Sequence, residues 1–309
     1  MKSISIIAPL HNEQESIESL IERLILTLRK MKLTYEIILV DDGSSDSTWS
    51  KLIQLSEITE NLKCVRLSKN FGQHNAITAG LSMCNSEWTV VMDGDLQDRP
   101  EEIPNLYSKA LEGFEIVFVS RKNRNESKFY LLAQKIFYKL LRKLSDIQFD
   151  AGTANFSIIN KKVVEAYNFI EDHNRFYGST IKWLGFKSTL IEADQGQRFA
   201  GETSYTLSSR WDLALATILN YSEKPLKIAI KIGIFVSTAS LAFGLFFAYR
   251  KIFFGEGILG WPSLIVSIYF LAGVILIFMG ILGIYIGQIL KEVKKRPSYL
   301  IDQILLSKN

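Results

Sequence analysis

Two stretches in the last third of the chain carry no charged residue, and they restrict its fold more than any other feature. One has 18 residues, from Ile232 to Tyr249, and the other has 29, from Pro262 to Leu290. An apolar run of about 18 residues or more can cross the hydrocarbon layer of a membrane as a helix. A soluble core helix as long as the second run would carry a polar face. The sequence therefore predicts a transmembrane hairpin over residues 228–290, with spans at about 228–249 and 262–289.

Positive charges flank this hairpin at both ends. The connection between the spans holds Arg250 and Lys251 against Glu256. The flanking lysines and arginine are more numerous: Lys224, Lys227, Lys231, Lys291, Lys294, Lys295 and Arg296. Because cytoplasmic flanks carry the excess of Lys and Arg, we expect a protein of the inner or plasma membrane with both termini in the cytoplasm. Residues 1–208 are then a cytoplasmic domain, and residues 291–309 a cytoplasmic tail.

The N-terminal part has the pattern of an α/β domain with a largely parallel sheet. Short apolar runs alternate there with polar loops and helical patterns, which predicts strands at Ser3–Pro9, Tyr35–Val40, Cys64–Leu67, Trp88–Met92 and Glu115–Val119. In such sheets ligands bind beyond the carboxyl ends of the strands. Polar clusters follow the first four strands, at 11–13, 41–46, 69–73 and 93–97. The sequence therefore predicts one shared binding site at this edge.

Two carboxylates mark the fourth of these clusters. Asp93 and Asp95 follow the strand directly, and a spacing of i, i+2 in extended backbone directs both side chains to one face. A pair of convergent carboxylates suits Mg²⁺ or Mn²⁺ bound to a diphosphate. An isolated Asp-x-Asp is more often an acidic turn after a strand, so the metal hypothesis depends on the neighbouring clusters.

Four motifs resemble the family 2 glycosyltransferases of the A-type nucleotide-sugar (Rossmann-like) fold. They are Ala8-Pro9-Leu10-His11-Asn12-Glu13, Val40-Asp41-Asp42-Gly43-Ser44-Ser45-Asp46, Lys69-Asn70-Phe71-Gly72 and Met92-Asp93-Gly94-Asp95-Leu96-Gln97. The chain is most similar to the branch that moves a sugar onto a polyprenyl phosphate, which includes dolichyl-phosphate mannose synthases and bacterial undecaprenyl-phosphate glucosyltransferases. The resemblance runs from Ser3 to about Pro297, with His11 in place of the family's usual aromatic residue.

This resemblance implies a hexosyltransferase that uses a nucleotide sugar, with a UDP-hexose favoured, and a polyprenyl phosphate acceptor. It also implies a single inverting displacement and a homotetramer. Nucleotide-binding residues are expected at Pro9, Asn12, Glu13, Asp41, Asp42, Lys69, Phe71, Gly72, Asp93 and Gln97. Asp95 is expected as the direct metal ligand, with Asp93 beside it. The alternative for Asp41 and Asp42 is that they cap the helix after the second strand.

Acceptor-phosphate binding is expected at Arg121, Arg124, Arg198 and Ser204. Arg198 joins Asp93 and Asp95 as a candidate catalytic residue, because a guanidinium binds phosphate bidentately. Ser204 stands where many members of the family have lysine. Asn155 replaces the acid of the family's Gly-x-x-Asp-Phe motif, but a phosphomonoester with a second pKa near 6 is already mostly a dianion at pH 7 and needs no strong base. The alternative is that some of these arginines are ordinary surface residues.

Two amphipathic segments are predicted near the membrane. Residues 127–144 combine a broad apolar face with five basic residues, a pattern typical of helices that lie on membrane lipids, although a core helix with a solvated lysine face has the same pattern. Residues 209–227 are expected to be interfacial. The N-terminus enters a strand at once, so no signal peptide is expected.

Composition and weaker motifs bear on the remaining possibilities. A net charge of +4 indicates no basic surface for nucleic acid, and Cys64 and Cys84 are expected to be reduced thiols. One alternative is a processive polysaccharide synthase, because residues 209–211 faintly resemble part of its Gln-x-x-Arg-Trp motif. Leu207 occupies the glutamine position, however, and two spans are too few for a polymer channel. The other alternative is a non-catalytic membrane scaffold that binds a nucleotide.

Overall fold

The computed structural model describes residues 3–122, 153–172, 175–194, 224–254 and 260–307. These residues belong to two compact units. The first is a sheet domain, to which the described residues up to 194 and those from 296 onward contribute. The second is a helical unit, whose described residues are 224–254 and 260–295.

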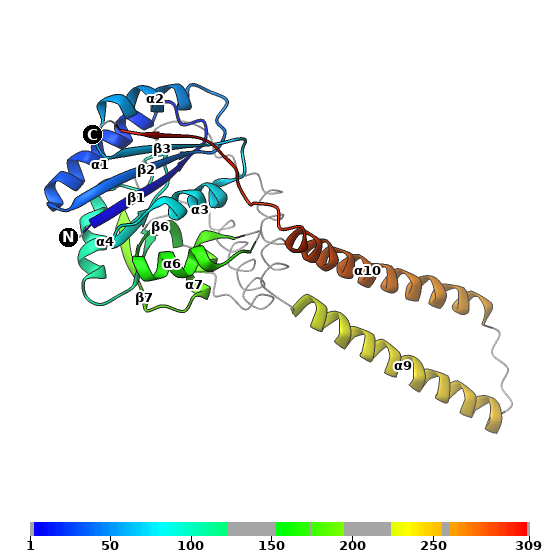
Figure 1. Ribbon diagram of the computed structural model, residues 1–309. Coiled ribbons are helices and arrows are strands. Elements are labelled where there is room, and N and C mark those ends of the chain that lie inside the picture. Colours follow the sequence, from blue (N-terminus) through cyan, green and yellow to red (C-terminus); the bar gives the residue numbers. More distant parts are fainter. Residues whose placement is uncertain (1–2, 123–152, 173–174, 195–223, 255–259, 308–309) are drawn as a thin grey trace. The chain divides into compact units, whose positions relative to one another are not determined.

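The sheet domain contains one mixed sheet of eight strands (Figure 1). Its strands are β1 (Ser3–Leu10), β2 (Thr34–Asp41), β3 (Leu62–Leu67), β4 (Trp88–Val91), β5 (Ile116–Lys122), β6 (Thr153–Asn160), β7 (Ser188–Asp194) and β8 (Ile301–Leu306). Their spatial order is β7-β5-β6-β4-β1-β2-β3-β8. The strands from β4 to β3 in this order are parallel, whereas β6 and β8 run antiparallel to their neighbours.

Helices cover both faces of the sheet. One buried cluster joins the sheet to α1 (Ile17–Met31), α2 (Thr48–Ile58) and α4 (Ile103–Ala110), which follows the short 3₁₀ helix η1 (Pro100–Glu102). The other cluster joins the opposite face to α3 (Gln73–Met83), α6 (Lys161–Phe169) and α7 (Tyr177–Trp183). The domain is therefore a three-layer α/β/α structure, as the strand–helix alternation predicts.

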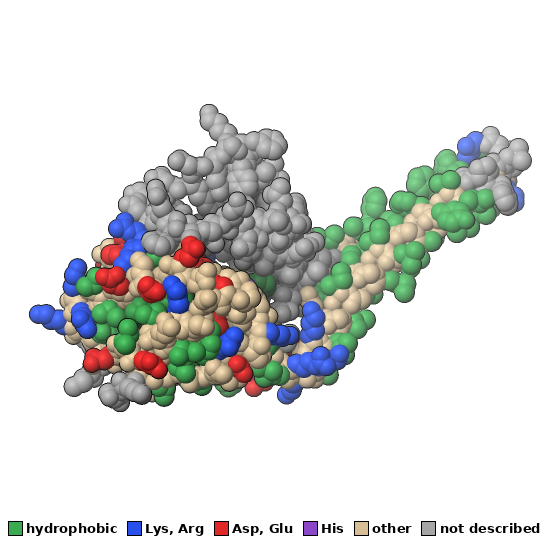
Figure 2. Space-filling view, turned by 90° about the horizontal axis from the view of Figure 1, so that it is seen from above, with side chains coloured by type: hydrophobic (Ala, Val, Ile, Leu, Met, Phe, Trp, Pro, Cys, Tyr) green, Lys and Arg blue, Asp and Glu red, His purple; other side chains and the backbone are tan. Residues whose placement is uncertain are grey.

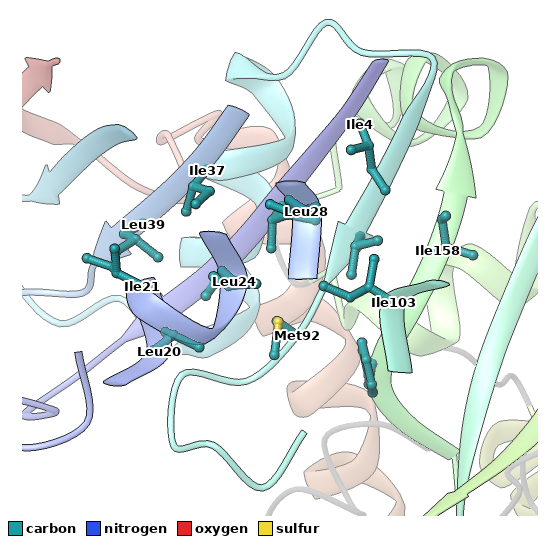
Figure 3. Packing of buried hydrophobic residues seen from close by; sticks show 14 of the residues in the cluster. Ile4, Leu20, Ile21, Leu24, Leu28, Ile37, Leu39, Met92, Ile103 and Ile158 are labelled. Atoms are coloured by element: carbon teal, nitrogen blue, oxygen red, sulfur yellow. The ribbon is translucent and has the colours of Figure 1, made fainter. Parts of the chain in front are cut away.

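The packing of α1 shows how the sequence pattern produces this core. Five apolar residues of α1 recur at helical spacing, lie on one face of it and are buried, namely Ile17, Leu20, Ile21, Leu24 and Leu28. Figure 3 shows Leu20, Leu24 and Leu28 of α1 together with Ile4 and Ile37 of the sheet. Burial of a leucine side chain of this kind contributes roughly 1.5–3 kcal/mol.

The order of the strands creates a crevice at one place. The chain runs outward from β1 through β2 to β3, and then returns to place β4 on the other side of β1. Because crossovers between parallel strands are right-handed, α1 and α2 lie on one face and α3 lies on the other. The strand order reverses between β1 and β4, and ligands of open α/β sheets bind at such a reversal, outside the carboxyl ends of the strands.

Three strands of the sheet, β6, β7 and β8, are not among the predicted elements. β6 lies between β4 and β5 and contains Asn155, and its placement makes the sheet mixed. β8 lies within residues 291–309, for which only a tail was expected, and it pairs with β3 along the edge of the sheet. The alternation in β8 is weak because most of its side chains are exposed on both faces, so no periodic burial signal marks it.

The two predicted spans are both long helices, α9 (Lys224–Phe254) and α10 (Trp261–Val293). By length and composition, Leu226–Phe254 and Leu264–Val293 can each cross a membrane, with mean hydropathies of 1.9 and 2.7. In Figure 2, hydrophobic side chains project from these helices along most of their visible length. The predicted interfacial segments, residues 127–144 and most of 209–227, lie outside the described residues.

Candidate functional site

The loop after β1 is fixed by the loop after β2. The backbone N–H of Asn12 donates to Oγ of Ser44 at 2.9 Å, and that of Glu13 donates to Oγ1 of Thr48 at 2.9 Å. The Asn12 side chain accepts from the backbone N–H of Ser45 at 2.9 Å. Asn12 has φ 55°, a left-handed conformation that asparagine tolerates better than most residues. The structure thus places Asn12 and Glu13 at the predicted edge, and the side-chain oxygen of Asn12 helps to hold the two loops together.

Asp42 connects the loop after β2 to the loop after β3. Its two carboxylate oxygens accept from the backbone N–H groups of Phe71 and Gly72, at 2.7 and 2.8 Å. Burial raises the pKa of Asp42, and these hydrogen bonds oppose that shift. Gly43 allows the close approach of the two loops, because a Cβ on it would collide with the backbone of Lys69 and φ is +62°. Asp42 therefore binds protein backbone in this structure.

Asp41 has a different environment. Its side chain is fully buried, and Oδ1 accepts from the backbone N–H of Ser44 at 3.1 Å. Nε of Arg66 lies 3.5 Å from Oδ2, close enough for an ion pair, but Oδ2 has no hydrogen-bond partner among the described residues. A buried acceptor without a donor costs roughly 1–3 kcal/mol, so this oxygen is well suited to accept an N–H group from a ligand.

Neither aspartate caps the helix after β2, which was the alternative for Asp41 and Asp42. The first backbone N–H of α2, that of Thr48, donates instead to Oδ1 of Asp46 at 2.9 Å. Hydrogen bonds from Thr48 and Gln14 outweigh the effect of burial and lower the pKa of Asp46. A third acid of the same motif, which precedes the N-cap residue Ser47, thus accepts this N–H.

The Asp93 and Asp95 pair lies just beyond β4, and both residues are partly exposed. Oδ1 of Asp93 accepts from the Gln73 side chain at 2.6 Å, and its backbone N–H donates to Asp98 at 3.0 Å. Oδ1 of Asp95 accepts from the backbone N–H of Gln97 at 3.0 Å. These bonds orient both carboxylates at the reversal point between β1 and β4, where Gly94 packs against Leu10 without room for a Cβ.

This pair fits a divalent cation that is shared with a substrate. The described residues contain no group of three or more His, Cys, Asp or Glu side chains placed to hold a metal by themselves. Mg²⁺ commonly uses only one or two carboxylates together with substrate phosphates and water. Asp93 and Asp95 satisfy that requirement.

The remaining predicted nucleotide-binding residues share the same edge. Pro9 is the penultimate residue of β1, and Gln97 is partly exposed beyond Asp95. Nζ of Lys69 lies 5.0 Å from the ring centroid of Phe71, and Gly72 begins α3 as its N-cap. The structure thus brings together the loops after β1, β2, β3 and β4, as the sequence pattern predicts.

The predicted acceptor side is described only in part. Arg121 is the penultimate residue of β5, and its register partner is Ala193 of β7. Arg124, Arg198 and Ser204 lie outside the described residues. Asn155 is a partly exposed residue of β6, and its carbonyl oxygen accepts from Oγ of Ser157 at 2.9 Å.

Several residues of the site were missed by sequence reasoning. Gln73 and Asp98 hold Asp93, Ser44 and Thr48 hold the loop after β1, and Arg66 faces Asp41. Asp98 and Gln73 adjoin recognised motifs, so proximity in sequence was an available signal. Arg66 lies inside a predicted strand, and only the strand order shows that it is beside Asp41.

Comparison with known proteins agrees with this geometry. The model of the family "Glycosyl transferase family 2" matches residues 5–168. An uncharacterised glycosyltransferase of Synechocystis is 36% identical over 302 residues, which cover 97% of this chain and 95% of the relative. A prophage bactoprenol glucosyl transferase homologue of Escherichia coli is 32% identical over 97% of this chain and 99% of its own length.

A third relative and a solved structure extend the comparison. An undecaprenyl-phosphate 4-deoxy-4-formamido-L-arabinose transferase of Photorhabdus laumondii is 29% identical over 99% of this chain and 95% of its own length. The crystal structure of a mycobacterial protein shares the fold with a TM-score of 0.50 at 17% identity, over 72% of this chain and 76% of that one.

The A-type fold and the acidic loops at its carboxyl edge define a glycosyltransferase, and the chain belongs to glycosyltransferase family 2. Within that family, it falls in the polyprenyl-phosphate branch, together with relatives named bactoprenol glucosyl transferase and undecaprenyl-phosphate sugar transferase.

Proposed function

We propose that this enzyme transfers a hexose from a UDP-sugar to a polyprenyl phosphate at the cytoplasmic face of the membrane. The product is a lipid-linked monosaccharide. The observation that carries the donor half of the proposal is the buried Oδ2 of Asp41, which accepts no hydrogen bond from the described residues. The acceptor half is supported by the names of the relatives and by the two apolar helices.

The surroundings of Asp41 favour uracil over guanine. Uracil presents one imide N–H, which a single carboxylate oxygen can accept. Guanine presents two adjacent donors, which pair best with both oxygens of a carboxylate. Oδ1 of Asp41 already accepts from Ser44, and Oδ2 is the oxygen that remains for a ligand.

Asp93 and Asp95 are proposed to hold Mg²⁺ or Mn²⁺ on the donor diphosphate. When bound, the cation neutralises the charge that develops on the departing nucleotide diphosphate. Gln73 keeps the Asp93 carboxylate oriented through its 2.6 Å hydrogen bond. The backbone N–H of Gln97 orients Asp95 through a hydrogen bond to Oδ1.

The acceptor phosphate is proposed to be its own nucleophile. It is mostly a dianion at pH 7, so the amide of Asn155 can stand where related enzymes have an acid. The remaining requirement is to bring two anionic groups together, which positioning and charge screening achieve. Arg121, Arg124 and Arg198 are proposed to supply this positive charge, and Ser204 to assist them, in a single inverting displacement.

The proposal is tested with the purified full chain, undecaprenyl phosphate and Mg²⁺. UDP-glucose, UDP-galactose, UDP-N-acetylglucosamine and GDP-mannose are supplied separately, and the lipid products are identified by mass spectrometry. We expect one sugar per lipid from a UDP-sugar. Longer glycans would indicate a processive synthase, and transfer from GDP-mannose alone would refute the choice of UDP. If no donor is turned over, the result would favour the alternative of a non-catalytic membrane scaffold that binds a nucleotide.

A further inference from the structure

Three polar side chains form a row across the edge of the sheet at its carboxyl end. Asp41 of β2 is the register partner of Arg66 of β3, and Arg66 is the register partner of Gln303 of β8. Residues directly opposite each other on neighbouring strands project from the same face of a sheet. The row therefore leads from the buried carboxylate of the site to the strand that follows the second membrane span.

Trp49 connects the members of this row. It is the second residue of α2, it is 5% exposed, and it covers the same face. Its Nε1–H donates to Oε1 of Gln303 at 3.2 Å, and the guanidinium carbon of Arg66 lies 5.5 Å from the centroid of its ring system. Nε of Arg66 in turn lies 3.5 Å from Oδ2 of Asp41. A continuous series of contacts thus links Gln303 to Asp41.

The position of Arg66 relative to Asp41 determines how this series of contacts affects the site. A buried carboxylate requires a compensating positive charge. If the guanidinium donated directly to Oδ2, it would occupy the oxygen that a ligand needs. At 3.5 Å and outside hydrogen-bond geometry, Arg66 supplies the charge without occupying the oxygen. Its attraction to the face of Trp49 holds it there, because a guanidinium stacks favourably on an indole.

The backbone of β3 changes at the same point. The register between β3 and β8 shifts between Arg66 and Leu67. Such irregularities bend a strand and redirect its side chains, and they are frequent next to active sites. Gln303 pairs with Arg66 directly before this shift. The row therefore crosses β8 where its pairing with β3 is still regular.

We propose that Gln303, Trp49 and Arg66 are positioning residues that keep Asp41 ready to accept a nucleobase N–H. The strand after the second membrane span is then a functional part of the nucleotide site. This inference rests on the proposed function, because it assumes that Asp41 binds the base of the donor. Gln303 and Trp49 act through Arg66 and do not themselves contact the nucleotide.

The test uses the full chain with two variants of the Gln303–Trp49 hydrogen bond. Trp49→Phe keeps an aromatic face for Arg66 but removes the N–H donor, and Gln303→Leu removes the acceptor. Leu305→Ala is the matched control, because Leu305 lies two residues further along β8 and packs into the same core, with Cys64 rather than Arg66 as its register partner. UDP affinity is measured by calorimetry, KM and kcat with the preferred UDP-sugar, and stability by thermal unfolding.

We expect Gln303→Leu and Trp49→Phe each to weaken UDP binding about three- to ten-fold, the effect of one lost hydrogen bond. KM should rise with kcat nearly unchanged, as when uniform binding is lost. The double variant should be no weaker than either single one, because both remove the same contact. Leu305→Ala should lower the melting temperature and leave UDP affinity unchanged.

Two outcomes overturn the inference while leaving the proposed function intact. One is wild-type UDP affinity in both Gln303→Leu and Trp49→Phe. The other is an equal loss of affinity in Leu305→Ala, which would reduce β8 to a structural support. A wild-type chain that binds neither UDP nor GDP would instead refute the proposed function, and the inference with it.

Discussion

At the scale of single residues, two groups of acidic side chains accompany the buried Asp41 in the site. Asp42, Asp46 and Asp98 accept hydrogen bonds from backbone N–H groups and hold loops in place. Asp93 and Asp95 are partly exposed at the reversal point of the sheet. Chemistry at this edge therefore depends on the second group, and its geometry depends on the first.

Replacement of Asp95 by asparagine tests the metal hypothesis. The amide keeps the shape of the side chain and an oxygen for the Gln97 N–H, but it loses the charge that binds a cation. We expect at least a hundredfold loss of turnover, on the order of 3 kcal/mol in the activation barrier, with the melting temperature almost unchanged. Asp172→Asn, at an exposed acid outside the site, serves as the control. Near-normal turnover of Asp95→Asn with Mg²⁺ would exclude Asp95 as the ligand.

His74 predicts how stability responds to acid. Burial lowers its pKa to about 4, from an ordinary value of 6.5, and its ring packs edge-on against Phe176 at 5.1 Å. Between these two values the unfolded chain binds the proton that the folded chain does not. Stability is therefore lost as the pH falls from about 6.5 toward 4, by about 2 kcal/mol between pH 7 and pH 5.

The measurement is urea unfolding of wild type and His74→Phe at both pH values. We expect the variant to lose about 2 kcal/mol less than the wild type on acidification, whatever its stability at pH 7. His11→Phe, which replaces an exposed histidine, is the control and should retain the acid sensitivity. An identical loss in His74→Phe and the wild type would contradict the buried neutral state.

Prediction from sequence succeeded where a residue's role follows from its place after a strand. The loops containing Asn12, Asp41, Lys69 and Asp93 meet because parallel strands end at one edge. Sequence could not separate Asp41 from Asp42, because adjacent acids look alike until the fold decides which oxygen meets a backbone N–H. Arg66 was missed because its role depends on the partner strand rather than on any local pattern.

At the scale of elements, the strands followed by polar loops and helical patterns were predictable, whereas β6, β7 and β8 were not. The predicted boundaries of the first four strands lie within two residues of β1 to β4. β6 has no preceding crossover helix within the described residues to mark it, and β8 exposes most of its side chains. Pairing with distant strands defines both elements, and a single sequence does not reveal such pairing.

The two long helices lead to a prediction of membrane topology. Positive flanks place both ends of the hairpin in the cytoplasm, so the connection between α9 and α10 should face outward. A cysteine introduced at position 257 should react with an impermeant maleimide added to intact cells, whereas one at position 307 should react only after lysis. The background for both is Cys84→Ser, because Cys84 is partly exposed and Cys64 is buried. The reverse pattern would overturn the cytoplasmic placement of the donor site.

At the scale of the whole molecule, the sheet domain is not a continuous segment of the chain. Its described residues end at 194 before the helices and resume at 296 after them. β8 then completes the edge beside β3, through pairing that runs from Lys63 to Leu67. Without β8, the backbone groups of β3 would be left unpaired at an exposed edge, a condition that favours aggregation.

The position of β8 makes the membrane hairpin an insertion within the catalytic domain rather than an appendage. A soluble enzyme should accordingly be obtained by excising residues 207–295 and joining the flanks with a flexible Gly/Ser linker. The same chain stopped at residue 206 should aggregate or bind UDP weakly. Size-exclusion chromatography and calorimetry with UDP compare the two proteins, and equal behaviour would show that β8 is dispensable. Domain boundaries for this enzyme should therefore be drawn around an internal deletion, and the last residues of the chain should be kept.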